Sequence, residues 1–152
     1  MSTLQARNET NIQAPVSRIW AIITDIHVLH KINPGVIKAE GRMDKQGETR
    51  NCQIDNKGKK GSMTERLTEL VHEKKTVWTL ERDTMGMSKM LKNTQFVFHL
   101  EKLGDQQTKV ISETYYQPAH LIAKIMNRLM MKKMIAKAQG EILSNIKSLT
   151  EN

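Results

Sequence analysis

The stretch that decides the fold is NIQAPVSRIWAIITD, residues 11–25. Residues 4–13, which run into this stretch, are an alternating polar segment that carries Thr10 and Ile12 and weakly indicates a β-strand. Pro15 then breaks the alternation, and proline is well suited to the first turn of a helix. From Val16, apolar residues recur at i, i+3, i+4 and i+7, which is helical spacing. The stretch therefore predicts a strand that passes directly into a helix, with a second short helix over residues 25–31.

The middle of the chain predicts β-strands from Val36 to Tyr116. Glycines separate the runs, and several runs alternate, so that Phe96 and Phe98 oppose Gln95 on the other face. A sheet with one buried face, one solvent-exposed face and short turns between its strands is typically antiparallel. The six predicted strands are residues 36–42, 48–56, 62–72, 75–82, 92–102 and 107–116.

After Pro118 the pattern is helical to Leu149, a run of ~30 residues and ~45 Å. One apolar stripe is expected to face the sheet, and it consists of Ile122, Ile125, Leu129, Ala136, Gly140 and Leu143. A second zone, which the N-terminal helices would cover, consists of Ile135, Ile142, Ile146 and Leu149. No linker or repeat interrupts the chain, so we expect one domain over residues 1–152.

This order of elements resembles the START-like helix-grip fold and, within it, the polyketide cyclase/dehydrase and lipid-transport family. Residues 11–25 resemble the family's opening, in which a strand ends at Ala-Pro and a Trp-bearing helix runs to an Asp. Residues 33–36, 67–69 and 108–110 resemble a turn and two strand signatures, whereas Ile32 stands where the family often has an aromatic residue. The resemblance implies an α+β fold in which a seven-stranded antiparallel sheet curls around the long C-terminal helix, with a cavity between them.

Composition excludes several classes of protein. The single cysteine, Cys52, cannot form an internal disulfide or a multi-cysteine zinc site. His27 and His30 have no third ligand nearby in the sequence, so we expect no metal and no cofactor. No apolar run approaches the ~20 residues of a membrane helix. The first residues lack the features of a signal peptide, so we expect a cytoplasmic protein.

The candidate ligand site consists of residues expected to point from the strands and the helix into the cavity. They are Trp78, Leu80, Arg82, Met87, Phe96, Phe98, Val110, Ser112, Thr114, Tyr116, Ile122, Ile125, Met126 and Leu129. Apolar walls would supply affinity, and Arg82, Ser112, Thr114 and Tyr116 would orient the ligand. Arg82 suits a carboxylate or phenolate, because its guanidinium offers a bidentate fork. The alternatives are a solid core and an Arg82 that reaches solvent at a strand end.

The net charge is +8, and much of the excess lies on the long helix. Lys124, Arg128 and Lys132 are spaced at i, i+4 and i+8, and seven of the ten methionines lie between Met85 and Met134. This combination predicts a transient contact with an anionic membrane surface, whereas the alternative is a solvated helix face. We expect no nucleic acid partner, because aromatic residues are few and no binding motif occurs.

Three functions therefore remain open. The first is the binding of a small hydrophobic or amphipathic ligand, such as a lipid, an isoprenoid or a polyketide-like compound. The second is a polyketide aromatase/cyclase or dehydratase, which needs an inward acid–base group near its substrate. Asp25 and the Glu65/Glu69 pair are the carboxylates weighed for that role, and no catalytic residue is assigned. The third is a protein-binding module that uses the basic, Met-rich helix.

Overall fold

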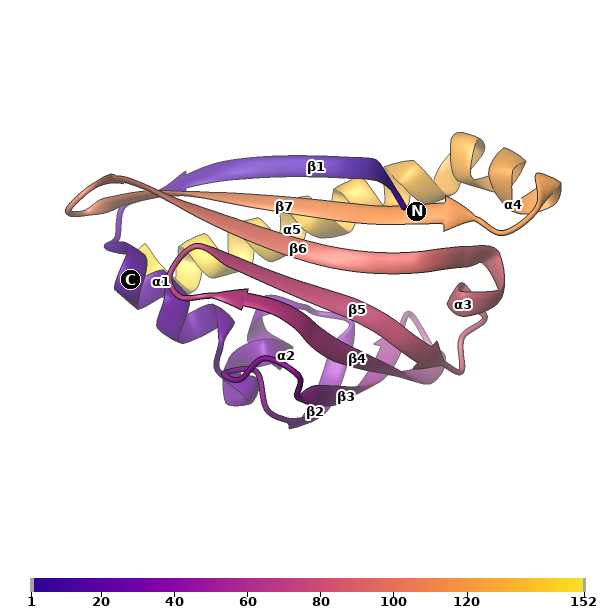
Figure 1. Ribbon diagram of the computed structural model, residues 1–152, viewed down its shortest axis with the longest axis horizontal. Coiled ribbons are helices and arrows are strands. Elements are labelled where there is room, and N and C mark those ends of the chain that lie inside the picture. The colour runs from indigo at the N-terminus through magenta and orange to yellow at the C-terminus, as the bar shows by residue number, and fades with distance from the viewer. Residues whose placement is uncertain (1, 152) are drawn as a thin grey trace.

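The computed structural model describes residues 2–151, which form a seven-stranded antiparallel sheet and a long C-terminal helix (Figure 1). The order in the sheet is β1-β7-β6-β5-β4-β3-β2. The strands are β1 (Thr3–Ile12), β2 (Val36–Gly41), β3 (Thr49–Asn56), β4 (Lys59–Val71), β5 (Lys75–Asp83), β6 (Leu91–Gly104) and β7 (Gln107–Pro118). This is the α+β helix-grip fold that the sequence predicted, and each predicted strand is present with its ends shifted by a few residues.

The short helices follow from local sequence signals. Pro15 caps α1 (Val16–Ile23), whose Ile19, Trp20 and Ile23 are buried. The expected second helix is a 3-10 turn, η1 (Ile26–Val28), followed by α2 (Leu29–Ile32). A further helical turn, α3 (Met87–Met90), lies between the predicted strands 75–82 and 92–102, where the sequence predicted no helix.

Asp83 explains the unexpected α3. Its carboxylate accepts hydrogen bonds from the backbone N–H groups of Met85, Met87 and Ser88. Burial alone would raise the pKa of Asp83, but the hydrogen bonds from Ser88, Met87 and Met85 together hold that pKa below its usual value. The carboxylate therefore stays ionised and fixes the chain between β5 and β6.

Two apolar clusters form the core. One joins the end of β1, α1 and the last turns of the C-terminal helix, and Ile12, Ile19, Leu143 and Ile146 are at its centre. The other lies under α2 and strands β2 to β5, and it contains Leu29, Val36, Met43, Cys52, Leu67 and Trp78. The short helices therefore cover one end of the sheet, as expected for the second apolar zone of the long helix.

The C-terminal helix has three parts in one continuous run: α4 (Leu121–Met126), a π-helical turn η2 (Asn127–Met131) and α5 (Lys132–Glu151). Packing of α5 is chiefly on β1, with further contacts to β7, α1 and α2 (Figure 1). No helix within residues 2–151 is long and apolar enough to cross a membrane.

The expected apolar stripe of this helix is wrong in its first half. Leu143 is buried, but Ile122, Ile125, Leu129 and Gly140 are exposed. In α4 and at the start of η2 the buried positions are Ala123 and Asn127, each two residues before a predicted position, Ile125 or Leu129. A π turn holds about one residue more than an α turn, so η2 shifts which side chains of α4 meet the sheet. The displaced side chains, with their neighbours, form what we call the apolar helix face: Leu121, Ile122, Ile125, Leu129, Met130 and Met134, all exposed.

Candidate functional site

The inner face of the sheet, against which α5 packs, holds the strand members of the candidate site. Paired residues of antiparallel strands point to the same face, so Trp78, Phe96 and Thr114 form one row across β5, β6 and β7. Phe98 and Ser112 are paired in the next row. Of these strand residues, Trp78, Val110, Ser112, Thr114 and Tyr116 are buried, and Leu80, Phe96 and Phe98 are half-buried.

Arg82 is the exception: its inward position is wrong, and the alternative, an arginine near a strand end that reaches solvent, is confirmed. The register between β4 and β5 shifts, so that Glu65 pairs with Leu80 whereas Thr64, the residue before it, pairs with Arg82. A β-bulge at Glu81 absorbs the extra residue and turns the rest of the strand over. Arg82 therefore takes the outer face of the sheet and is exposed to solvent.

The inner face instead carries Arg50, which the sequence reasoning missed. Arg50 Nε lies 2.9 Å from Glu65 Oε1, and both side chains are nearly buried. The guanidinium carbon lies 3.9 Å from the centre of the Trp78 ring, and Nη1 lies 3.5 Å from Met43 Sδ. Of the two carboxylates weighed together, Glu65 is thus inward and ion-paired, whereas Glu69 pairs with Lys75 at the surface.

Cys52 lies on the same inner face and in the same cluster. Burial raises the pKa of its thiol to about 11, so the thiol is protonated at neutral pH. A protonated, buried thiol is a poor nucleophile and a poor metal ligand, and Cys52 therefore acts as a small apolar side chain here.

A chain of buried polar contacts attaches the C-terminal helix to β1 and β7. Tyr116 Oη donates to Asn127 Oδ1, and Asn127 Nδ2 donates to Gln5 Oε1 at 3.1 Å. Further along the helix, Gln139 Nε2 donates to Thr114 Oγ1 at 2.8 Å. Burial raises the pKa of Tyr116 to about 12, so its hydroxyl remains a donor to Asn127. Two of the four expected ligand-orienting groups, Thr114 and Tyr116, are therefore engaged with the helix.

The other inward hydroxyl groups differ in their partners. Ser112 is buried on the same face, one pair along β7 from Thr114. Thr76 pairs with Phe98 across β5 and β6, and its Oγ1 is buried without a hydrogen-bond partner among the described residues. An unpaired buried hydroxyl is costly in an apolar surrounding, so Thr76 Oγ1 is a group that a polar ligand atom would stabilise.

The helical members of the candidate site are less enclosed than the strand members. Met87 in α3 and Met126 in α4 are half-buried, whereas Ile122, Ile125 and Leu129 belong to the apolar helix face. Ala123 and Asn127 meet the sheet, so these three isoleucine and leucine side chains project from other sides of the helix.

Two open grooves lie elsewhere on the surface. One, of about 660 Å³, runs beside the β4–β5 turn and contains His72, His99 and Leu100. The other, of about 510 Å³, lies between α5 and the turn at Pro34. Neither groove is lined by a member of the candidate ligand site. Within residues 2–151, no cluster of His, Cys, Asp and Glu side chains is placed to hold a metal ion.

Comparison with known proteins identifies the family. A family model described as polyketide cyclase / dehydrase and lipid transport matches residues 3–151. The chain belongs to this family. A search of curated protein sequences finds no match. The chain's membership of this family, together with its fold, suggests hydrophobic ligand binding or polyketide cyclase activity.

Solved structures share the fold at low sequence identity. The ZhuI aromatase/cyclase from Streptomyces sp. R1128 is 14% identical, with a TM-score of 0.79 over 99% of this chain and 94% of that one. Major latex-like protein 151 from Panax ginseng is 13% identical, with a TM-score of 0.77 over 99% of both chains. Norcoclaurine synthase from Thalictrum flavum, solved with dopamine and hydroxybenzaldehyde, is 16% identical, with a TM-score of 0.71 over 98% of this chain and 86% of that one. Enzymes and a major latex-like protein thus share this fold with the chain. The fold therefore does not distinguish an enzyme from a binding protein, and the residues of the site have to be considered for that purpose.

Proposed function

We propose that this protein binds a small hydrophobic or amphipathic molecule, such as a lipid, an isoprenoid or a polyketide-like compound, between the inner face of the sheet and the C-terminal helix. One observation carries the proposal. The helix packs chiefly at the β1 and β7 side of the sheet, while Phe96, Phe98 and Leu80 further across the inner face remain only half-buried. Aromatic and aliphatic side chains at such positions gain free energy when an apolar ligand covers them, at about 25 cal/mol per Å².

Fewer polar side chains are available to a ligand in the proposed site than the sequence predicted. Thr114 and Tyr116 already bind the helix, and Arg82 lies on the other face. Ser112 and Thr76 remain, in the row that holds Phe98. Two neutral hydroxyl groups on an apolar wall suit a ligand with a hydroxyl or carbonyl group better than a fully ionised one.

The alternative is an aromatase/cyclase or dehydratase-type enzyme. Its best support is Glu65, a carboxylate on the inner face. General acid–base catalysis needs a group that exchanges its proton with the substrate. The Arg50 guanidinium already binds the Glu65 carboxylate at 2.9 Å, so this carboxylate is engaged by a protein partner, and we place the binding function first.

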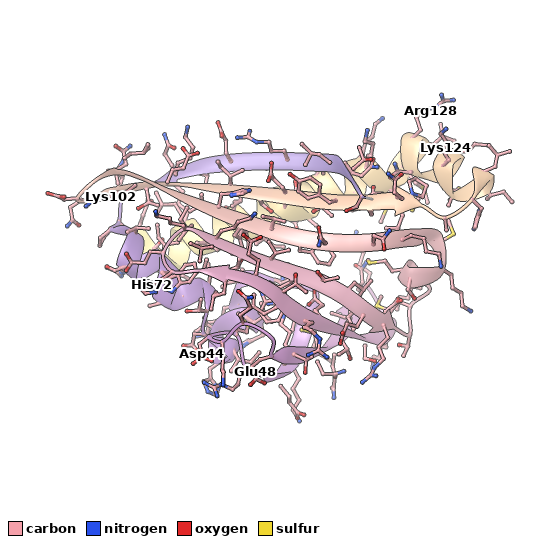
Figure 2. All side chains as sticks on the ribbon, in the orientation of Figure 1. Asp44, Glu48, His72, Lys102, Lys124 and Arg128 are labelled. Atoms are coloured by element: carbon pink, nitrogen blue, oxygen red, sulfur yellow. The ribbon has the colours of Figure 1, made fainter. Side chains whose placement is uncertain are left out.

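Ligand exchange would take place where the apolar helix face is exposed. Lys124, Arg128 and Lys132 lie on the same helix, so we propose a transient contact with an anionic membrane surface there. Figure 2 shows Lys124 of α4 and Arg128 of η2 projecting at one end of the molecule. A protein partner at this helix is the competing use of the same surface.

The first experiment is native mass spectrometry of freshly purified protein, followed by solvent extraction. A co-purifying lipid or polyketide-like mass would support binding and name the ligand class. The wall is tested by titration with a fluorescent apolar probe in Phe98→Arg, which should abolish probe binding. Leu103→Arg is the matched control, because Leu103 is on the same strand but 47% exposed near the β6–β7 turn. Unchanged probe binding in a folded Phe98→Arg protein would reject this wall.

A further inference from the structure

We propose that one whole end of the molecule, not the helix alone, docks on the surface of an anionic lipid bilayer. Antiparallel strands bring every second connection to the same end of a sheet. The connections β3–β4, β5–β6 and β7–α4 therefore lie together, and Figure 1 shows α3 and α4 at that end. We call residues 55–60, 81–92 and 120–133 the α4 end. The biological purpose of this docking rests on the proposed ligand exchange, whereas the docking itself is argued from charge and exposed apolar surface alone.

The α4 end holds nearly all of the chain's excess charge. Residues 55–60 contain three basic residues and one acidic residue, residues 81–92 contain three and two, and residues 120–133 contain four and none. Together they carry a net charge of +7, against +8 for the whole chain. The three connections at the opposite end are residues 42–48, 69–75 and 101–109, and each contains two basic and two acidic residues. The two ends of one sheet therefore differ by seven charges although they have the same number of connections.

Charge pairing strengthens this contrast. All ten basic side chains of the α4 end are exposed, and the described residues offer none of them an ion pair. The carboxylates of this end are already occupied: Asp83 binds the backbone of α3, Asp55 accepts from the Gly58 N–H, and Glu81 pairs with Arg66. At the opposite end, Lys102 pairs with Asp105 and Lys109 with Glu101. Of the two ends, the α4 end is therefore the one with a net positive charge on its described residues, whereas basic and acidic residues balance at the opposite end.

Apolar surface occurs at the same end. Leu121 is 72% exposed and Leu129 is 64% exposed, and both lie on the same helical run as Lys124 and Arg128. Lysine and arginine beside exposed leucine and isoleucine are typical of segments that lie in a membrane interface. Three separate segments that carry exposed charge at one end of the molecule suit an extended anionic surface, whereas exposed aliphatic side chains contribute little to nucleic acid binding. An anionic bilayer is therefore the partner that these observations favour.

The test is sedimentation of the full-length protein with vesicles of phosphatidylcholine, with and without roughly 30% phosphatidylserine. We expect binding only to the anionic vesicles, and weaker binding as salt is added. A Lys57→Gln, Lys59→Gln, Lys60→Gln variant should bind on the order of 100-fold more weakly, because each lysine near an anionic surface contributes about 1 kcal/mol. These lysines are far from the C-terminal helix in sequence, so the variant separates docking by the whole end from contact by the helix alone.

The matched control removes the same charge at the opposite end with Lys45→Gln, Lys74→Gln and Lys102→Gln, and it should bind like the wild type. Equal loss in both triple variants, or no sedimentation of the wild type, would overturn the proposal. Unimpaired vesicle binding of the Lys57→Gln, Lys59→Gln, Lys60→Gln variant would also overturn the proposal and leave contact by the helix alone. Titration with the apolar probe is done without vesicles, so docking does not affect it. Normal probe binding by a protein that does not bind vesicles would leave the proposed ligand function intact. Vesicle binding by a protein that does not bind the probe would reject the ligand function and leave the docking proposal intact.

Discussion

Removing Glu65 should destabilise the protein far more than removing an equally well-formed ion pair on the other face of the sheet. In a Glu65→Leu variant, the Arg50 guanidinium stays on the inner face with only Trp78 and Met43 as partners. The Arg50 and Glu65 side chains are 12% and 7% exposed, so water cannot compensate for the lost carboxylate. An uncompensated buried charge costs about 3–5 kcal/mol. For a domain of this size that loss lowers Tm by roughly 10 °C.

The assay is equilibrium urea unfolding of a double-mutant cycle. The Arg50→Met, Glu65→Leu double variant should lie within about 1 kcal/mol of the wild type, because replacing both charges removes the desolvation cost as well as the attraction. Glu81→Leu is the control, since Glu81 and Arg66 form a bidentate pair at 2.8 and 3.1 Å but are 39% and 43% exposed. That loss should be below about 1 kcal/mol.

Two results would refute this reasoning. One is a Glu65→Leu loss no larger than that of Glu81→Leu. The other is a double variant as unstable as the worse single variant. Either would mean that the Arg50–Glu65 pair does not stabilise the inner face through its charge, and Glu65 would return as a candidate acid–base group for the enzyme alternative.

Three further predictions use the same structure. Tyr116→Phe removes the donor to Asn127 and leaves a buried carbonyl unpaired, so the free energy of unfolding should fall by about 1–3 kcal/mol; a loss near zero in urea unfolding would show that this contact does not attach the helix. Asp83 has a folded pKa below its usual value, so its stabilising effect is present above the unfolded pKa and is lost as pH falls through the folded one; the stability difference between wild type and Asp83→Ala should therefore shrink in acid, and a difference that is constant with pH would contradict it. Cys52, buried and with a pKa of about 11, should react with a thiol reagent only after unfolding in urea, so rapid labelling of the folded protein would refute its place in the core.

Local patterns were sufficient to predict most of the fold. The proline after the first strand, the alternation around Phe96 and Phe98, and the helical period after Pro118 each depend on neighbours within a few residues. The family resemblance then supplied the sheet's curvature around the helix. The strand before Pro15, the strand with Phe96 and Phe98 and the helical run after Pro118 are all present in the structure.

The errors occur where one additional residue changes the phase of an element. The bulge at Glu81 reverses Arg82, and the π turn displaces the stripe of α4, although neither alters composition or period over a long window. Arg50 was missed for another reason. It alternates in phase with Cys52 and Ile54, a signal that the sequence does contain, but a charged residue in such a series is ordinarily assigned to a strand end.

The π turn makes the exposure of α4 dependent on the hydrogen-bond pattern of five residues. If Asn127–Met131 closed into an α-helix at unchanged chain length, every side chain before it would rotate by about 100° relative to α5. Leucine and isoleucine would then turn toward the sheet, and the asparagine bound to Tyr116 would leave its place. Deletion of one residue within the segment would instead remove the extra residue of the π turn and leave α4 in its present direction. A local change of backbone pairing is thus sufficient to interconvert an exposed apolar helix end and an enclosed one without any change in sequence.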